Sequence, residues 1–101
     1  MKKLRISAAA EHDLDQIWLY IATNSASLER ANKFVELLTK RLLVLAAAPG
    51  AGTVRDEIEA GVRALPIGDY IVYYREAKKH IIVSRIIHGS REQGTAYTSG
   101  Q

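Results

Sequence analysis

The 101-residue chain contains no cysteine. This absence excludes a disulfide framework, a zinc site built on thiolates and a cysteine nucleophile. The chain also has no apolar run of the roughly 18–20 residues that are needed to cross a bilayer. Acidic residues follow the basic start Met1–Lys3, where a signal peptide would have its apolar stretch, so we expect a cytoplasmic protein.

The excess of positive charge is small. The chain has 14 Lys and Arg against 11 Asp and Glu, a net charge of +3, which does not by itself indicate a nucleic-acid-binding protein. Residues 1–59 carry eight basic and eight acidic side chains, whereas residues 60–101 carry six basic and three acidic ones. The whole excess therefore lies in the C-terminal part. With 48% hydrophobic and 25% charged residues, the length predicts one globular domain.

Hydrophobic periodicity predicts a strand and two helices in the first half of the chain. Residues 2–7 alternate between apolar and basic side chains, which is typical of a short strand. Ser7 is a suitable N-cap for a helix over residues 8–23, and Ser27 for a longer helix over residues 28–47. Because only a short loop separates them, we expect the helices to form a hairpin.

The period changes from 3.6 to 2 in the second half of the chain. Residues 62–67, 70–75 and 80–88 predict three strands joined by turns. The expected fold class is α+β, with an N-terminal strand, a helical hairpin and a three-stranded antiparallel segment that forms one sheet packed on the two helices. We assign residues 1–91 to this domain and expect residues 92–101, which are small and polar, to form a flexible C-terminal tail.

The last predicted strand is apolar on both sides. Strict alternation places Ile81, Val83 and Ile87 on one face and Ile82 and Ile86 on the other. An antiparallel sheet with one solvated face should alternate with polar residues, so both faces need a cover. The helical hairpin supplies one cover. Either the small sheet is simply well buried, or a partner supplies the second cover.

No histidine or carboxylate cluster predicts a metal or cofactor site. His80 and His88 lie at opposite ends of one strand, about 26 Å apart at about 3.3 Å per residue. Asp13 is expected to be a solvated charge near a helix start, although His88 remains of interest at the end of its strand. The best candidates for a binding site are four arginines of the predicted sheet, near several tyrosines. Their fixed guanidinium groups either bind carboxylates or phosphates of a partner, or form bonds within the domain. These arginines are Arg63, Arg75, Arg85 and Arg91.

Four segments, in order and at matching spacing, resemble the ParE-type toxins of the RelE/ParE superfamily, which occur in bacterial type II toxin–antitoxin systems. The resemblance covers about residues 4–91. The segments are ISAAAEHDLDQIWLYIA (residues 6–22), LAAAPGAGTVRDE (45–57), GVRALPIGDYIVYYRE (61–76) and IIVSRIIHGSRE (81–92).

The resemblance implies the strand, hairpin and sheet fold, and a ParD-like antitoxin as partner. The C-terminal segment of such an antitoxin would wrap the toxin and cover the surplus apolar surface. Acidic residues of that segment would pair with arginines of the sheet. We expect toxicity to depend on His88 and Arg91. The expected antitoxin contacts are Phe34, Leu37, Leu38, Tyr74, Arg75 and Arg85.

The superfamily contains two activities, and the resemblance favours one of them. RelE-like members are metal-independent, ribosome-dependent mRNA endonucleases, whereas ParE-like members are poisons of DNA gyrase. Basic residues of the nuclease branch align with Val62, Ala64 and Ile71, which are apolar here, so most of the charge that stabilises a phosphorane-like transition state is absent. Arg91 and Tyr97 do match nuclease positions by spacing.

We therefore expect a gyrase inhibitor with no chemistry, no cofactor and no sequence-specific nucleic-acid binding of its own. One alternative is a nuclease, and another is a non-toxic relative that only binds the antitoxin. The nuclease would use Arg63, Arg85, His88, Arg91 and Tyr97.

Overall fold

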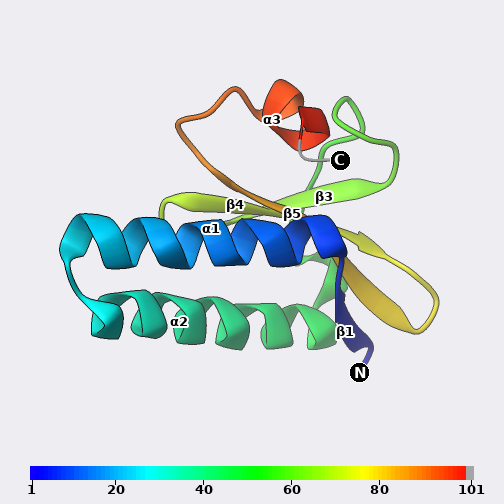
Figure 1. Cartoon of the computed structure of the whole chain (residues 1–101). Helices are drawn as coiled ribbons and strands as arrows, with labels where there is room; N and C mark the ends of the chain where they lie inside the picture. The colour runs from blue at the N-terminus through cyan, green and yellow to red at the C-terminus, as the bar shows by residue number, and fades with distance from the viewer. Residues whose placement is uncertain (100–101) are drawn as a thin grey trace.

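The computed structural model describes residues 1–99. The chain forms three α-helices, one short 3-10 helix and five strands over these residues (Figure 1). In chain order they are β1 (Lys3–Ile6), α1 (Ala8–Ser25), α2 (Leu28–Ala47), η1 (Pro49–Ala51), β2 (Thr53–Val54), β3 (Val62–Ile67), β4 (Tyr70–Glu76), β5 (His80–His88) and α3 (Gln93–Ser99).

Serine caps begin both long helices, as the sequence predicted. The Ser7 side chain accepts a hydrogen bond from the Ala10 N–H, and the Ser27 side chain accepts one from the Arg30 N–H, both at 3.1 Å. Ala26 adopts a left-handed conformation (φ 52°) that ends α1 and reverses the chain into α2. The two helices therefore form the predicted hairpin, and they lie on one face of the sheet (Figure 1).

The five strands form one sheet in the order β1-β5-β4-β3-β2. Strand β1 is parallel to β5, and the other neighbours are antiparallel. The predicted α+β fold is confirmed. The sequence did not predict β2, in which Thr53 and Val54 pair with Ala64 and Arg63 of β3. A strand of two residues is too short to show an alternating pattern.

The main core lies between the helical hairpin and the sheet. Leu38, Leu42 and Leu45 of α2 are no more than 1% exposed and pack with Ile17 of α1. The sheet contributes Ile67, Val72, Tyr74, Ile81, Val83 and Ile86.

A β-bulge in β5 changes which side chains face the helices. Tyr73 pairs with Arg85 and Tyr74 pairs with Val83, so Ser84 is the extra residue. The bulge moves the alternation by one position, and Ile86 joins the main core with Val83. Ile87 lies on the opposite face. The strict alternation expected for Ile86 and Ile87 was therefore wrong.

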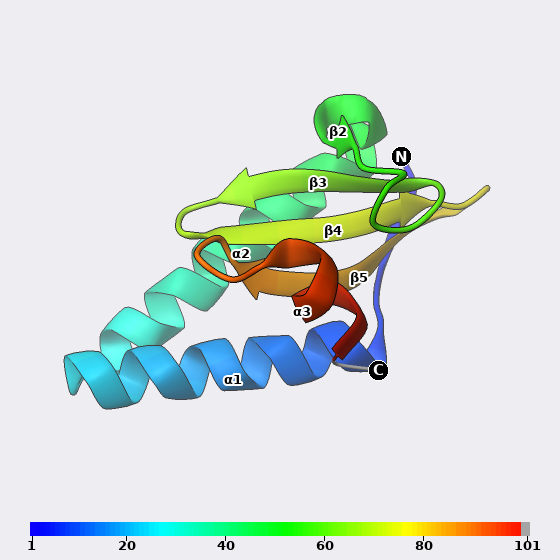
Figure 2. The ribbon, with the colours of Figure 1, turned by 90° about the horizontal axis from the view of Figure 1, so that it is seen from above.

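The C-terminal segment of the chain covers the second face of the sheet. Helix α3 lies over this face (Figure 2). Its Ala96 and Tyr97 are 3% and 1% exposed, and they pack on a second core. Residues 92–101 were expected to form a flexible tail, and this is wrong for residues 93–99, which form a helix. The helix is held in place because its apolar side chains are buried against the sheet. Residues 100–101 lie outside the described residues. The second cover is thus internal. Its partners on the sheet are Val62, Ala64, Tyr73 and Ile87.

Candidate functional site

A buried ion pair joins α1 to β5. The Arg85 Nε and Nη2 atoms donate to the two carboxylate oxygens of Asp13 at 2.7 and 2.9 Å. The Ile86 N–H donates to the same carboxylate at 2.9 Å. The Asp13 carboxylate raises the pKa of Arg85, because hydrogen bonding to the charged guanidinium stabilises that form. Asp13 is therefore not the solvated charge that was expected.

Arg85 also holds the C-terminal helix. Its Nη1 atom donates to the carbonyl oxygens of Ala96 and Tyr97 at 2.7 and 2.6 Å. These bonds join α1, β5 and α3 through one guanidinium that is only 4% exposed. Arg85 was expected to bind an antitoxin, but its donors are used inside the domain.

Two more of the expected antitoxin contacts are interior. Leu38 and Tyr74 are both 0% exposed. The Tyr74 hydroxyl donates to the Pro49 carbonyl and accepts from the Gly52 N–H, both at 2.7 Å, and thereby fixes the loop that follows α2. These side chains cannot reach a partner unless the core opens. Three of the six expected contacts remain accessible, namely Phe34, Leu37 and Arg75.

The five residues of the alternative nuclease set do not share one open site. Tyr97 is buried, and its hydroxyl bonds Ser84 Oγ at 2.9 Å. Arg63 Nη1 donates to the Gly52 carbonyl at 2.8 Å. Only the remaining members, Arg85, His88 and Arg91, line a common pocket.

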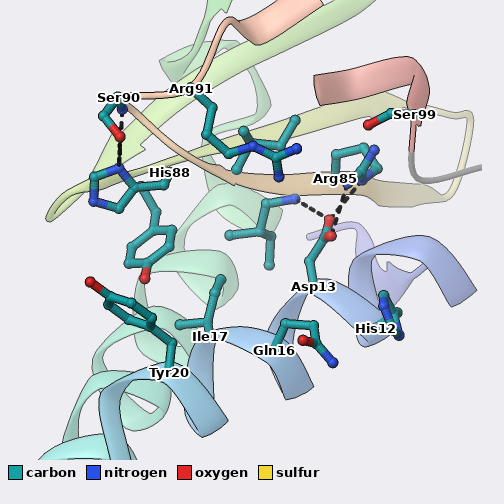
Figure 3. Close-up of a pocket in the computed structure, with 13 residues that line it drawn as sticks. His12, Asp13, Gln16, Ile17, Tyr20, Arg85, His88, Ser90, Arg91 and Ser99 are labelled. Carbon is teal, nitrogen blue, oxygen red and sulfur yellow. Dashed lines mark hydrogen bonds and ion pairs between the residues drawn. The ribbon is translucent and has the colours of Figure 1, made fainter. Parts of the chain in front are cut away.

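That pocket has a volume of about 580 Å³ and lies between α1 and the end of β5 (Figure 3). Its size falls within the range of small-ligand sites, about 300–1,000 Å³. In addition to the buried ion pair, Ser99 of α3 and Ile87 of β5, it is lined by His12, Gln16, Ile17, Tyr20, Tyr70, Ile86, His88, Ser90 and Arg91.

The turn after β5 fixes His88 at one end of the pocket. The Ser90 N–H donates to His88 Nδ1 at 3.1 Å, so the proton of a neutral ring lies on Nε2. Tyr70 packs edge-on against this ring, with centroids 5.1 Å apart, and burial raises the pKa of its hydroxyl. The structure thus brings His88 and Arg91, the two residues expected to matter for toxicity, to one pocket.

A second candidate surface is the outer face of α2, which we define by Arg30, Leu37, Lys40, Arg41 and Val44. All five are exposed, with Leu37 at 41% and Val44 at 61%. At about 100° per residue, four of them fall in one narrow stripe, with Lys40 at its edge. The stripe combines apolar and basic side chains. No three His, Asp or Glu side chains of residues 1–99 are arranged to hold a metal ion.

No helix of residues 1–99 combines the length and the apolar character that a membrane span requires.

Comparisons with known proteins agree with this architecture. Residues 4–93 match the family described as the ParE toxin of the type II toxin–antitoxin system parDE. The chain is 32% identical over 90 residues to Toxin ParE1 of Caulobacter vibrioides, across 89% of this chain and 92% of that protein. A solved structure of a chromosomal ParDE toxin–antitoxin system from P. aeruginosa superposes with a TM-score of 0.75 at 27% identity, covering 87% of this chain and 96% of that one. The chain therefore belongs to the ParE toxin family of type II toxin–antitoxin systems.

Proposed function

We propose that this ParE-family toxin arrests growth in the cytoplasm by inhibiting DNA gyrase, and that a cognate ParD-like antitoxin neutralises it. One observation carries the choice of gyrase over the ribosome. The positions that align with basic residues of the nuclease branch are Val62, Ala64 and Ile71, and the first two are 0% and 6% exposed. All three contribute to the second core beneath α3. A ribosome-bound message would meet an apolar, covered surface where a nuclease needs cations.

The proposed target is tested with purified protein in a gyrase supercoiling assay. We expect inhibited supercoiling or trapped cleavage complexes. Unchanged supercoiling together with an absence of cleavage complexes would refute the gyrase proposal. Primer extension on ribosome-bound message tests the nuclease alternative, for which cuts in the ribosomal A site are the signature. Expression without growth arrest would instead favour a non-toxic relative.

The outer face of α2 supports a ParD-like antitoxin as partner. Leu37 and Val44 offer an unpartnered apolar stripe, and Arg30, Lys40 and Arg41 flank it with positive charge. An amphipathic acidic segment is complementary to both features. We propose that the antitoxin covers this face, with Phe34 beside it and Arg75 on the sheet.

Leu37→Glu tests the antitoxin surface. Introducing a carboxylate into the apolar stripe should weaken co-purification with the cognate antitoxin by at least about tenfold. Leu19→Glu is the matched control, because Leu19 is a 53% exposed leucine of α1 outside this face. Equal loss in both variants, or loss in neither, would contradict the assignment.

A further inference from the structure

The pocket beside α1 has the form of a short groove. His12, Gln16 and Tyr20 follow one another at intervals of one helical turn and line one wall, and all three are exposed. At about 1.5 Å per residue this wall is about 12 Å long. The turn after β5 supplies part of the opposite wall, where the Arg91 side chain runs along β5 toward Arg85 (Figure 3).

The groove has an apolar floor. Ile17, Ile86 and Tyr70 line it and are 5%, 3% and 9% exposed within the domain. An apolar side chain of a ligand would complete the burial of their remaining surface. A length of about 12 Å accommodates three to four residues of extended peptide at about 3.3 Å each.

The charge of the groove is positive and concentrated at Arg91. Among residues 1–99, one carboxylate lines the groove, that of Asp13, which is already bonded by Arg85 and by the Ile86 N–H. Arg91 forms no ion pair with any of the residues 1–99. Its guanidinium is therefore available to a carboxylate, which it can bind in a forked geometry.

We propose that this groove binds an extended segment of the toxin's cellular target that carries a carboxylate next to an apolar side chain. The carboxylate pairs with Arg91, the apolar side chain lies on Ile17 and Ile86, and Gln16 and Tyr20 hydrogen-bond the peptide backbone. The inference rests on the proposed function in two respects, namely that the toxin acts on a cellular target and that the antitoxin covers the outer face of α2.

The groove and the outer face of α2 lie on different sides of the helical hairpin. Asn32 marks the side of α2 that faces α1, because its side chain accepts a hydrogen bond from Trp18 Nε1 at 2.8 Å. Leu37 and Val44 point about 120–140° away from Asn32 around the helix axis. The groove lies between α1 and β5 instead. An antitoxin segment on α2 therefore leaves the groove open to a different protein, which is why we assign the groove to the target.

A peptide titration tests the groove directly and does not depend on the identity of the target. The probe is the acetylated and amidated tetrapeptide Leu-Glu-Leu-Glu, added to isotope-labelled full-length protein and followed by NMR. We expect a dissociation constant on the order of millimolar, with shifts centred on Gln16, Tyr20, His88 and Arg91. Arg91→Glu, or a peptide with glutamine in place of glutamate, should weaken binding about twofold to fivefold, as expected for loss of an exposed ion pair. No shifts in the groove, or shifts that are unchanged in Arg91→Glu, would overturn the proposal.

Expression in cells tests whether the ligand belongs to the target. Arg91→Glu and Tyr20→Ala should each relieve growth arrest, while antitoxin co-purification stays at the wild-type level. Lys78→Glu is the matched control, because Lys78 is an exposed cation in the β4–β5 turn, outside the groove, and it should behave as wild type. Melting curves show whether each variant folds.

The outcomes of these experiments distinguish a failure of the groove proposal from a failure of the gyrase proposal. Growth arrest that persists in Arg91→Glu and Tyr20→Ala, or antitoxin binding that is lost together with toxicity, would overturn the assignment to the target. Wild-type protein that arrests growth without affecting supercoiling, while both variants relieve the arrest, would refute gyrase as the target and support the groove. If the wild type does not arrest growth, the assignment to a target fails and the peptide titration alone decides whether the groove binds.

Discussion

Asp13 and Arg85 form a buried pair in which the charged groups are paired and hydrogen-bonded. The carboxylate accepts three hydrogen bonds, two from Arg85 and one from the Ile86 N–H, and the guanidinium donates two more to α3. Such a pair contributes little net stability compared with an apolar replacement. Removing one partner is different, because the other charge stays buried without compensation.

Asp13→Asn should therefore destabilise the domain strongly. We expect a loss of about 3–5 kcal/mol in the free energy of unfolding, since the Arg85 charge would lack its counterion. For a chain of this size that lowers the melting temperature by at least roughly 10 °C. Asp15→Asn is the matched control, because Asp15 is exposed on the same helix and should change stability by less than about 0.5 kcal/mol. Equal melting of the two variants would contradict a structural role for the pair.

Helix α3 covers the face of the sheet that the helical hairpin leaves open. Its seven residues are too few to form a stable isolated helix, so the helix depends on tertiary contacts. Tyr97 packs edge-on against Tyr73, with ring centroids 5.3 Å apart, and the Tyr73 hydroxyl bonds Gln93 Oε1 at 2.7 Å. The Glu92 carboxylate accepts from the Thr95 N–H at 2.6 Å at the start of the helix.

Tyr97→Ala should release α3 from the sheet. Loss of the buried ring is expected to cost about 3–5 kcal/mol, similar to other buried aromatic residues. The exposed face would then bind the dye ANS, which reports accessible apolar surface. Thr98→Ala is the control, because Thr98 is exposed on the same helix. ANS fluorescence at the wild-type level in folded Tyr97→Ala would show that α3 is not needed as a cover.

Removing the N-cap of α2 should lower the stability of the domain by a smaller amount. Ser27→Ala removes the side-chain acceptor for the Arg30 N–H and should cost about 1 kcal/mol of stability. Ser27→Asp retains an acceptor and should be close to wild type. Denaturant titration of the three proteins makes the comparison, and an Ala variant as stable as the Asp variant would contradict the capping role.

The molecule as a whole should lose stability at alkaline pH. Burial raises the pKa values of the Tyr70, Tyr73 and Tyr97 hydroxyls, because desolvation disfavours the phenolate. The folded state then holds these protons at a pH where the unfolded chain releases them. Stability from this source is fully present below the unfolded tyrosine pKa of about 10 and falls as pH rises above it.

Urea midpoints measured between about pH 8 and about pH 11 check this expectation. We expect a plateau followed by a decline, and Tyr73→Phe should flatten the decline. Tyr20→Phe should change the curve much less than Tyr73→Phe, because Tyr20 is 60% exposed and acts only through its charge near the Tyr70 hydroxyl. A midpoint that does not change over the whole range would show that these tyrosines ionise equally in both states.

Much of the fold was predictable because its signals are local. Helix α2 spans Leu28–Ala47 and β5 spans His80–His88, as periodicity predicted, and α1 runs two residues beyond its expected end. Serine caps and apolar spacing act over a few residues, so they can be read along the chain. Among the site residues, His88 and Arg91 were predicted and do share a pocket, whereas Asp13 was missed. Its partner lies 72 residues away, and no local pattern connects them.

The sequence by itself determined the α+β class, the hairpin, the three long strands and the resemblance to ParE-type toxins, because these depend on short-range spacing and on ordered segments. The tertiary structure decided which arginines are free. Arg85 is used inside the domain, while Arg91 faces a groove. It also decided that α3, rather than a partner, covers the second face of the sheet. These outcomes depend on which distant groups meet and exclude water, and one extra residue at Ser84 is enough to exchange the faces of a strand.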